Sequence, residues 1–177
     1  AGVRPVGEPE LLTVGEEQIC MNPLWSPDGR SIAYTSANYR GIWVIDVDSA
    51  VIRQISDEPA GGFGFCWSPD SRAIVARVAK FENYRRFNAI KRFDVQTEAE
   101  EELYAYTTKP LSLPRFDGQG NKIAFFADNH LQVVQSQREK ADLQKPLPAH
   151  AVPLMQGDRI VLWYPADDRF EPLSLPM

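Results

Sequence analysis

A six-residue stretch that occurs twice is the feature that most constrains the fold of this chain. Residues 25–30 read Trp-Ser-Pro-Asp-Gly-Arg, and residues 67–72 read Trp-Ser-Pro-Asp-Ser-Arg. Proline presets φ at the second turn position, aspartate accepts hydrogen bonds from the turn amides, and glycine tolerates a positive φ. Short hydrophobic segments flank each copy on both sides. The pattern therefore predicts antiparallel strand pairs joined by tight turns, and its recurrence after 42 residues predicts a repeat protein.

The first repeat contains four predicted strands, at residues 21–25, 31–34, 42–47 and 51–55. The third is rich in β-branched residues, which favour strands. The second repeat follows the same plan, but six additional residues precede its third strand. We expect a long loop at 80–86 to contain this insertion.

Two further repeats are more divergent. In the third repeat, Phe116 stands at the position of the turn tryptophan and is followed by Asp117-Gly118, without the Ser-Pro pair. In the fourth repeat, residues 153–159 are read as a shortened turn unit between the first and second strands. Residues 1–9 lack periodicity and are predicted to be a flexible arm before a single domain at 10–177. A short strand at 11–14 has no local partner and is predicted to complete the last repeat. The predicted repeats span 20–56, 63–106, 111–147 and 150–175.

The composition excludes several classes of protein. With 44% hydrophobic and 24% charged residues, the 177-residue chain is typical of a globular domain. A net charge of −5 argues against a general nucleic-acid-binding surface, although a local basic patch is compatible with it. No apolar run approaches the roughly 18 to 20 residues that a membrane span requires. The chain begins at Ala1, which either removal of a leader or expression of a segment explains.

The two cysteines, Cys20 and Cys66, do not have metal-ligand spacing. Cys66 precedes Trp67 in a predicted strand, which favours a role as a small buried apolar residue. A disulfide between the two cysteines is the alternative interpretation.

The repeat sequence resembles the WD-like β-propeller repeats of the TolB type, which also occur in tricorn-type proteases and in prolyl oligopeptidase propellers. Residues 25–34 match the motif W-S-P-D-G-[RK]-x-I-A-[FY] at every position, and the second copy departs from it at Ser71. The resemblance implies an all-β fold: a β-propeller of about four four-stranded antiparallel blades. Since propellers of this family commonly have more blades, we expect closure by the strand at 11–14 or completion by oligomerisation or by another chain. Exposed strand edges are disfavoured, which favours self-closure.

No catalytic or metal-binding motif is found. The sequence lacks G-x-S-x-G, and neither His130 nor His150 has a histidine or cysteine at ligand spacing, so we predict no metal, no cofactor and no catalytic residue. The aspartates of the repeated turn recur at one structural position, which indicates a structural role. The residues predicted to build these turns are Trp25, Pro27, Asp28, Gly29, Trp67, Pro69, Asp70, Phe116, Asp117 and Gly118.

The candidate binding residues all lie on one predicted face. Because successive strands alternate in direction, loops between second and third strands share a face with the connections between repeats; we call this the loop face. Arginine and aromatic residues on loops held by a rigid scaffold are typical of recognition surfaces. The predicted partner-binding residues are Asn38, Tyr39, Arg40, Phe81, Tyr84, Arg85, Arg86 and His150, with Asn129 and Tyr164 on the same face. The alternative for 80–86 is a solvated loop whose aromatic residues pack on a neighbouring blade.

These observations predict a noncatalytic propeller scaffold that binds a protein or peptide partner through its loop face. The alternative is a propeller domain or subunit that gates or positions substrate for a separate peptidase. A hydrolase or lyase acting inside the channel rests on fold analogy alone. The resemblance favours a bacterial periplasmic or other extracytoplasmic location over the cytoplasm.

Overall fold

The computed structural model describes residues 12–13, 19–136, 152–156, 159–164 and 168–172. Within these ranges the chain consists of β-strands, turns and two short 3-10 segments, η1 (Ala37–Tyr39) and η2 (Gly61–Phe63). No helix in the described part is long and apolar enough to cross a membrane.

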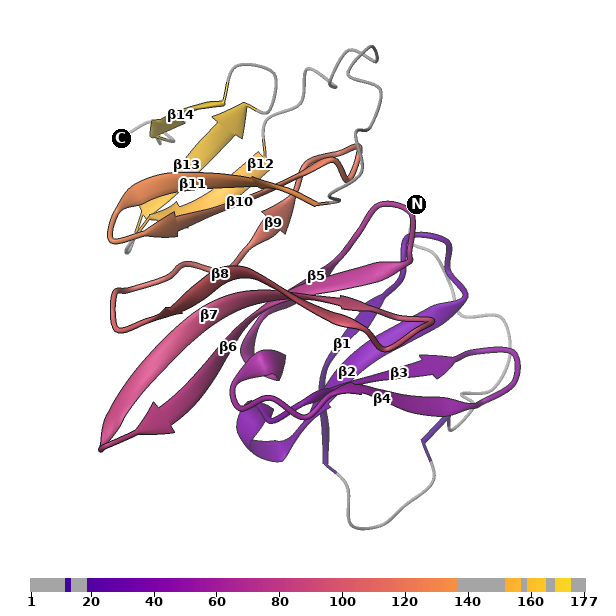
Figure 1. Cartoon of the computed structure of the whole chain (residues 1–177). Helices are drawn as coiled ribbons and strands as arrows, with labels where there is room; N and C mark the ends of the chain where they lie inside the picture. The colour runs from indigo at the N-terminus through magenta and orange to yellow at the C-terminus, as the bar shows by residue number, and fades with distance from the viewer. Residues whose placement is uncertain (1–11, 14–18, 137–151, 157–158, 165–167, 173–177) are drawn as a thin grey trace, which may run out of the picture.

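The strands form four antiparallel sheets whose spatial order follows the chain (Figure 1). The first sheet contains β1 (Cys20–Trp25), β2 (Ser31–Ser36), β3 (Ile42–Asp46) and β4 (Ile52–Ser56). The second contains β5 (Phe65–Trp67), β6 (Ala73–Glu82), β7 (Arg85–Asp94) and β8 (Glu100–Thr107). The third contains β9 (Arg115–Phe116), β10 (Lys122–Ala127) and β11 (His130–Gln135); the fourth contains β12 (Val152–Gln156), β13 (Arg159–Tyr164) and β14 (Arg169–Pro172). The predicted all-β class of antiparallel repeats is confirmed.

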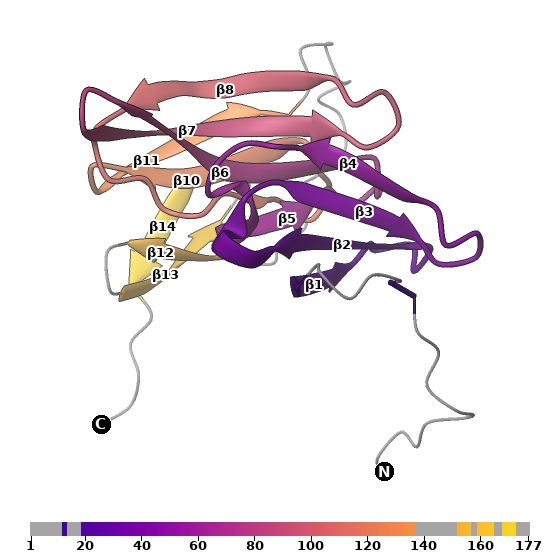
Figure 2. The same ribbon diagram turned by 90° about the horizontal axis from the view of Figure 1, so that it is seen from below.

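The four sheets pack face to face in chain order, with one hydrophobic cluster between each successive pair (Figures 1 and 2). Neighbouring residues of β6 serve two clusters, since Ile74 contributes to the interface with the first sheet and Val75 to the interface with the third. Both residues are completely buried. Alternating side chains of a central strand thus bury both faces of its sheet, which is why the strand reads as a continuous apolar run.

The repeated turn uses its serine and aspartate to satisfy its own backbone. Asp28 accepts hydrogen bonds from the Ser26 hydroxyl (2.6 Å) and the Arg30 amide (3.1 Å), and the Ser26 hydroxyl oxygen accepts one from the Ser31 amide (3.0 Å). The second turn repeats this network with Ser68 and Asp70. Ser71 has φ +63°, close to the +72° of Gly29, so the serine adopts the left-handed conformation that glycine adopts in the first copy.

The structure corrects the expectation that 80–86 is an inserted loop. Strands β6 and β7 continue through this segment as a regular hairpin, with Phe81 opposite Arg86 and Glu82 opposite Arg85. The two-residue turn at Asn83 and Tyr84 has positive φ at both positions, +49° and +60°, as a type I′ turn requires. The additional residues therefore lengthen both strands of the hairpin.

The end of the chain also differs from the expected arrangement. The side chain of Gln156, at the end of β12, donates to the carbonyl of Asn129 in the β10–β11 turn (3.0 Å). This end of β12 therefore lies on the loop face. The sequence predicts the opposite face, because 153–159 is read as a turn unit between first and second strands. The predicted closing strand at 11–14 lies partly outside the described residues, and Leu12 and Thr13, which are described, belong to no strand.

Cys20 and Cys66 are not joined by a disulfide, so the structure does not contain this alternative. Cys20 is exposed, whereas Cys66 packs against the cluster between the second and third sheets. Burial raises the pKa of the Cys66 thiol. The packing agrees with the interpretation of Cys66 as a small apolar residue.

Candidate functional site

A hollow of about 330 Å³ opens on the loop face, between η1, η2 and the β6–β7 hairpin. We call it the arginine hollow. Its lining residues are Asn38, Tyr39, Arg40, Pro59, Ala60, Phe63, Arg77, Phe81 and Arg86.

Close packing fixes the two loops that form one side of this hollow. The Thr35 hydroxyl donates to the carbonyl of Gly41 (2.8 Å), and the Ser36 hydroxyl donates to that of Arg40 (3.0 Å). Gly62 lies directly against Thr35, since a Cβ added to it would be 1.8 Å from the threonine hydroxyl. Any other residue at this glycine would push η2 away from the end of β2, where Thr35 lies, so η2 is held there by close contact.

Three guanidinium groups, those of Arg40, Arg77 and Arg86, give the hollow its charge. None of the three forms an ion pair with a carboxylate in the part of the chain that the structure describes. No aspartate or glutamate is among the described residues that line it, although the whole chain carries a net charge of −5. A local basic patch therefore exists on an acidic protein. Its guanidinium groups, which have no carboxylate partner among the described residues, favour an anionic ligand.

Arg77 is the half-buried member of the three. It donates from Nη1 to the carbonyl oxygen of Leu111 (2.5 Å), and its guanidinium carbon lies 5.5 Å from the centre of the Phe63 ring. Its Nε is buried and has no partner among the described residues. Burial, and then the charge of Arg86, lower the pKa of Arg77, but a guanidinium is so basic that it stays charged at neutral pH.

Aromatic side chains complete the wall of the hollow. Tyr39 and Phe63 meet edge to face with ring centres 5.4 Å apart. Phe81 is 68% exposed on the hairpin. Because Phe81 and Arg86 are directly paired across the hairpin, their side chains lie on the same side of the sheet. The hollow thus offers a cation beside an apolar surface, as many recognition sites do.

Five of the predicted binding residues line the arginine hollow: Asn38, Tyr39, Arg40, Phe81 and Arg86. Tyr84 is fully exposed at the hairpin turn, and Arg85 pairs with Glu82 on the other side of the strands. His150 lies outside the described residues. The binding role of these residues stays a prediction; Tyr84 and Arg85 do not line the arginine hollow.

Sequence reasoning missed Arg77 and Phe63. Arg77 interrupts the apolar run of β6, and a charged residue within such a run was an available signal. Phe63 follows Gly61-Gly62, and nothing in that stretch distinguishes an exposed aromatic residue from a buried one.

The described residues contain no cluster of histidine, cysteine and carboxylate side chains that could hold a metal ion. His130 lies on the loop face, where its Nδ1 is 2.8 Å from the carbonyl oxygen of Asp128. The sequence and geometry therefore assign no metal ligand in these ranges.

The chain is similar to several known proteins. No family model matches the sequence. It is 27% identical over 150 residues to the uncharacterized peptidase YuxL of Bacillus subtilis (strain 168), an alignment that covers 82% of this chain and 21% of that protein. The structure is similar to that of TolB from Acinetobacter baumannii, with a TM-score of 0.59 and 16% identity over 91% of this chain and 45% of the other.

Two enzymes have similar structures. An oligogalacturonate lyase in complex with manganese gives a TM-score of 0.63 at 15% identity, covering 94% of this chain and 56% of that chain. A prolyl endopeptidase gives 0.54 at 14% identity, covering 90% and 22%. The chain thus spans between about a fifth and just over half of the length of these proteins. The predicted β-propeller fold and its likeness to TolB-type repeats are confirmed.

These similarities correct the expectation of a noncatalytic protein. The similar sequence is that of a peptidase, and the similar structures include a lyase and a prolyl endopeptidase. This chain aligns with only 21% of its peptidase relative. A nucleophile motif missing from this chain therefore says nothing about the other four fifths of such a peptidase.

Proposed function

We propose that this chain is the propeller part of a peptidase, and that its loop face receives a peptide and positions it for cleavage by a catalytic domain. The observation that carries the proposal is the arginine hollow, in which Arg40, Arg77 and Arg86 lack carboxylate partners among the described residues. Carboxylates and main-chain carbonyls of a peptide are acceptors that guanidinium groups bind well.

Two further observations support a peptide ligand. Tyr39, Phe63 and Phe81 place apolar surface beside the cations, as recognition of mixed polar and apolar side chains requires. The sequence similarity to a peptidase extends over 82% of the chain, and the similar fold of a prolyl endopeptidase covers 90% of it. The whole protein's substrate would therefore meet this face before or during cleavage.

Peptide capture tests the proposal. The immobilised protein is incubated with a digest of casein, and the retained peptides are identified by mass spectrometry. We expect a reproducible subset to be enriched, and Arg86→Ala to reduce that enrichment because it removes an unpaired cation from the hollow. Arg85→Ala is the matched control, because Arg85 is adjacent in the strand but lies on its other side.

The proposal would be contradicted if the parent protein retained no peptide. It would also be contradicted if the parent protein and Arg86→Ala enriched the same peptides equally. Retention of an oligogalacturonate in place of peptides would also contradict it and would favour an acidic sugar as ligand. Circular dichroism of each variant shows whether the fold is intact.

A further inference from the structure

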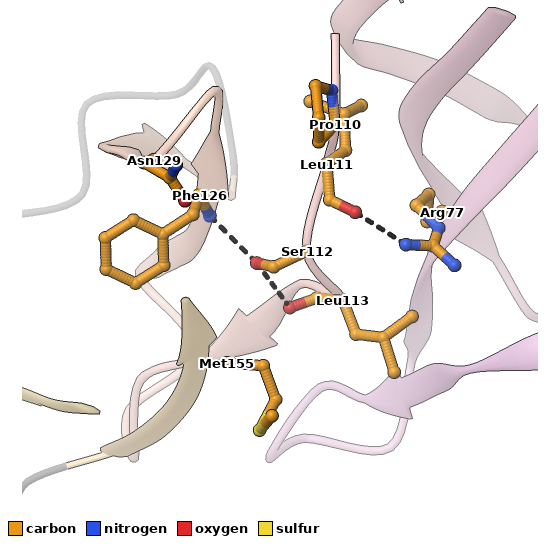
Figure 3. A pocket seen from close by; sticks show the side chains of 8 residues that line it. All are labelled: Arg77, Pro110, Leu111, Ser112, Leu113, Phe126, Asn129 and Met155. Carbon is orange, nitrogen blue, oxygen red and sulfur yellow. Dashed lines mark hydrogen bonds between the residues drawn. The ribbon is translucent and has the colours of Figure 1, made fainter. Parts of the chain in front are cut away.

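A second hollow, of about 320 Å³, shares Arg77 with the arginine hollow. Figure 3 shows the residues that line it. We call it the apolar hollow. Its lining residues are Arg77, Pro110, Leu111, Ser112, Leu113, Phe126, Asn129 and Met155. They come from β6, the β8–β9 connection, β10, the β10–β11 turn and β12, so this hollow spans the second, third and fourth sheets.

The surface of the apolar hollow has few free polar groups. The Ser112 hydroxyl accepts a hydrogen bond from the Phe126 amide (2.8 Å) and donates to the Leu113 carbonyl (3.4 Å), so it already serves the backbone. Met155 is 42% exposed here, although it is a large apolar residue. Methionine at such a surface adapts its shape to different apolar ligands.

Arg77 joins the two hollows, because it lines both. Its Nη1 bonds to Leu111 on the apolar side, and its guanidinium plane lies near Phe63 on the other (Figure 3 shows the bond to Leu111). The two hollows therefore adjoin at the Arg77 side chain. A peptide advances at most about 3.5 Å per residue, so groups one or two residues apart can reach both.

We propose that the arginine hollow and the apolar hollow are neighbouring subsites of one groove, which takes a peptide carrying a carboxylate within one or two residues of a bulky apolar side chain. The carboxylate lies among Arg40, Arg77 and Arg86, and the apolar side chain enters between Leu113 and Met155. This inference rests on the proposed function and adds to it the chemical class of the peptide. Charge complementarity favours an anion, since no aspartate or glutamate is among the described residues that line either hollow.

A structural role for Arg77 alone does not account for the arrangement. Its bond to Leu111 explains one buried cation at the joint between the second and third sheets. It does not explain why two further guanidinium groups, one directly after η1 and one on β7, line the same hollow without carboxylate partners in the described ranges.

Fluorescence anisotropy with four labelled tetrapeptides tests the proposal. The first probe is Gly-Ser-Gly-Leu with a free C-terminal carboxylate, the second is its amide, and the third replaces its leucine with glycine. The fourth, Gly-Gly-Asp-Leu amide, moves the carboxylate from the terminus to a side chain. We expect the second and third probes to bind about tenfold more weakly than the first, since each loses one subsite. The fourth probe shows whether the site accepts a side-chain carboxylate or requires the terminal one.

Variants assign each preference to its subsite. Arg86→Ala should reduce the difference between the first and second probes to about twofold or less, and Met155→Ser should do the same for the first and third. Arg85→Ala should retain both preferences. Equal affinities for the first three probes, or equal effects of Arg85→Ala and Arg86→Ala, would overturn the inference. If casein peptides are retained but none of the four probes binds, the inference fails while the proposed function stands; if neither binds, both fail.

Discussion

The indole Nε1 of Trp67 donates a hydrogen bond to the main-chain carbonyl of Leu24, 3.0 Å away, and so links the second sheet to the first. Trp67 is 7% exposed, whereas Trp25, at the same position of the first repeat, is 56% exposed. One repeated residue therefore has two environments, and only the buried copy is expected to matter for stability.

We expect Trp67→Phe to lower the free energy of unfolding by about 1 to 2 kcal/mol, because it leaves the Leu24 carbonyl without its donor and reduces packing. Urea denaturation at 25 °C measures this change. Trp25→Phe, the matched control, should change it by less than about 0.5 kcal/mol. Equal losses in the two variants would show that the hydrogen bond is not the cause.

A second link between sheets involves Lys91 of β7. Its ammonium group hydrogen-bonds to Glu58 in the β4–β5 connection and to Glu100 of β8, the latter at 3.1 Å. The side chains of Lys91 and Glu58 are 10% and 18% exposed. We expect Lys91→Met to lower the free energy of unfolding by about 3 kcal/mol, because the Glu58 carboxylate stays half-buried without its cation. Glu100→Gln should cost about 1 kcal/mol or less, since Glu100 is 57% exposed. Chemical denaturation compares the two.

The same lysine predicts a dependence of stability on alkaline pH. Burial lowers the pKa of Lys91, but its hydrogen bonds to Glu58 and Glu100 outweigh burial and raise the pKa above the ordinary 10.5. The folded state therefore retains the proton more strongly than the unfolded state. The stability difference between the parent and Lys91→Met should be constant below pH 10.5 and shrink as the pH rises above it. A difference that grows with pH would contradict this assignment.

The hairpin turn predicts a stabilising substitution. Tyr84 is fully exposed and has φ +60°, a conformation that costs a side chain about 1 kcal/mol. Tyr84→Gly creates the Asn-Gly pair that type I′ turns prefer, and should raise the free energy of unfolding by about 0.5 kcal/mol after the entropy cost of glycine. Tyr84→Val should lower it, because β-branched residues tolerate positive φ poorly. Thermal denaturation of both variants tests the turn; a gain from valine would contradict it.

The hydrogen bonds in the β3–β4 turn predict how a substitution changes the pKa of Asp46. Asp46 accepts hydrogen bonds from the hydroxyl (2.7 Å) and the amide (2.8 Å) of Ser49, and these bonds lower the pKa of Asp46 below the ordinary 3.8. The stabilisation that these bonds give the folded state is present above pH 3.8 and is lost as the pH falls. Ser49→Ala should raise the pKa of Asp46 toward 3.8, as NMR titration of the carboxyl carbon would show. The pKa of Asp28, which Ser26 lowers in another turn, is the internal reference and should not change.

The repeated turn made most of the fold predictable, because its chemistry is local. Ser26 and Asp28 bond within their own turn, so neither requires a distant partner to form the hairpin. The extension of β6 and β7 was not predictable in the same way. The turn residues Asn83 and Tyr84 lack the glycine that signals a two-residue hairpin, and length alone suggested a loop.

The loop residues of the candidate site were predictable from the sequence, whereas Arg77, which lies in a strand, was not. Topology alone brings Arg40 and Arg86 to one face, and the structure places both at the arginine hollow. Arg77 lies in a strand, and its role depends on contacts with Leu111 and Phe63, which are distant in sequence or belong to another sheet's connection. Such contacts are tertiary, and no periodicity encodes them.

The paired extension of β6 and β7 has a consequence for how this surface can diversify. A hairpin grows or shortens by one residue on each strand, so the height of this wall changes in steps of two residues. The strand register is preserved between the Ala73–Asp94 pair and the point of change, so the packed interior is not altered. Each step also exchanges which side chains of the tip face the hollow, because side chains alternate along a strand. Descendants of one scaffold could thus acquire different ligand preferences through small insertions and deletions at a single hairpin, without redesigning the sheets that support it.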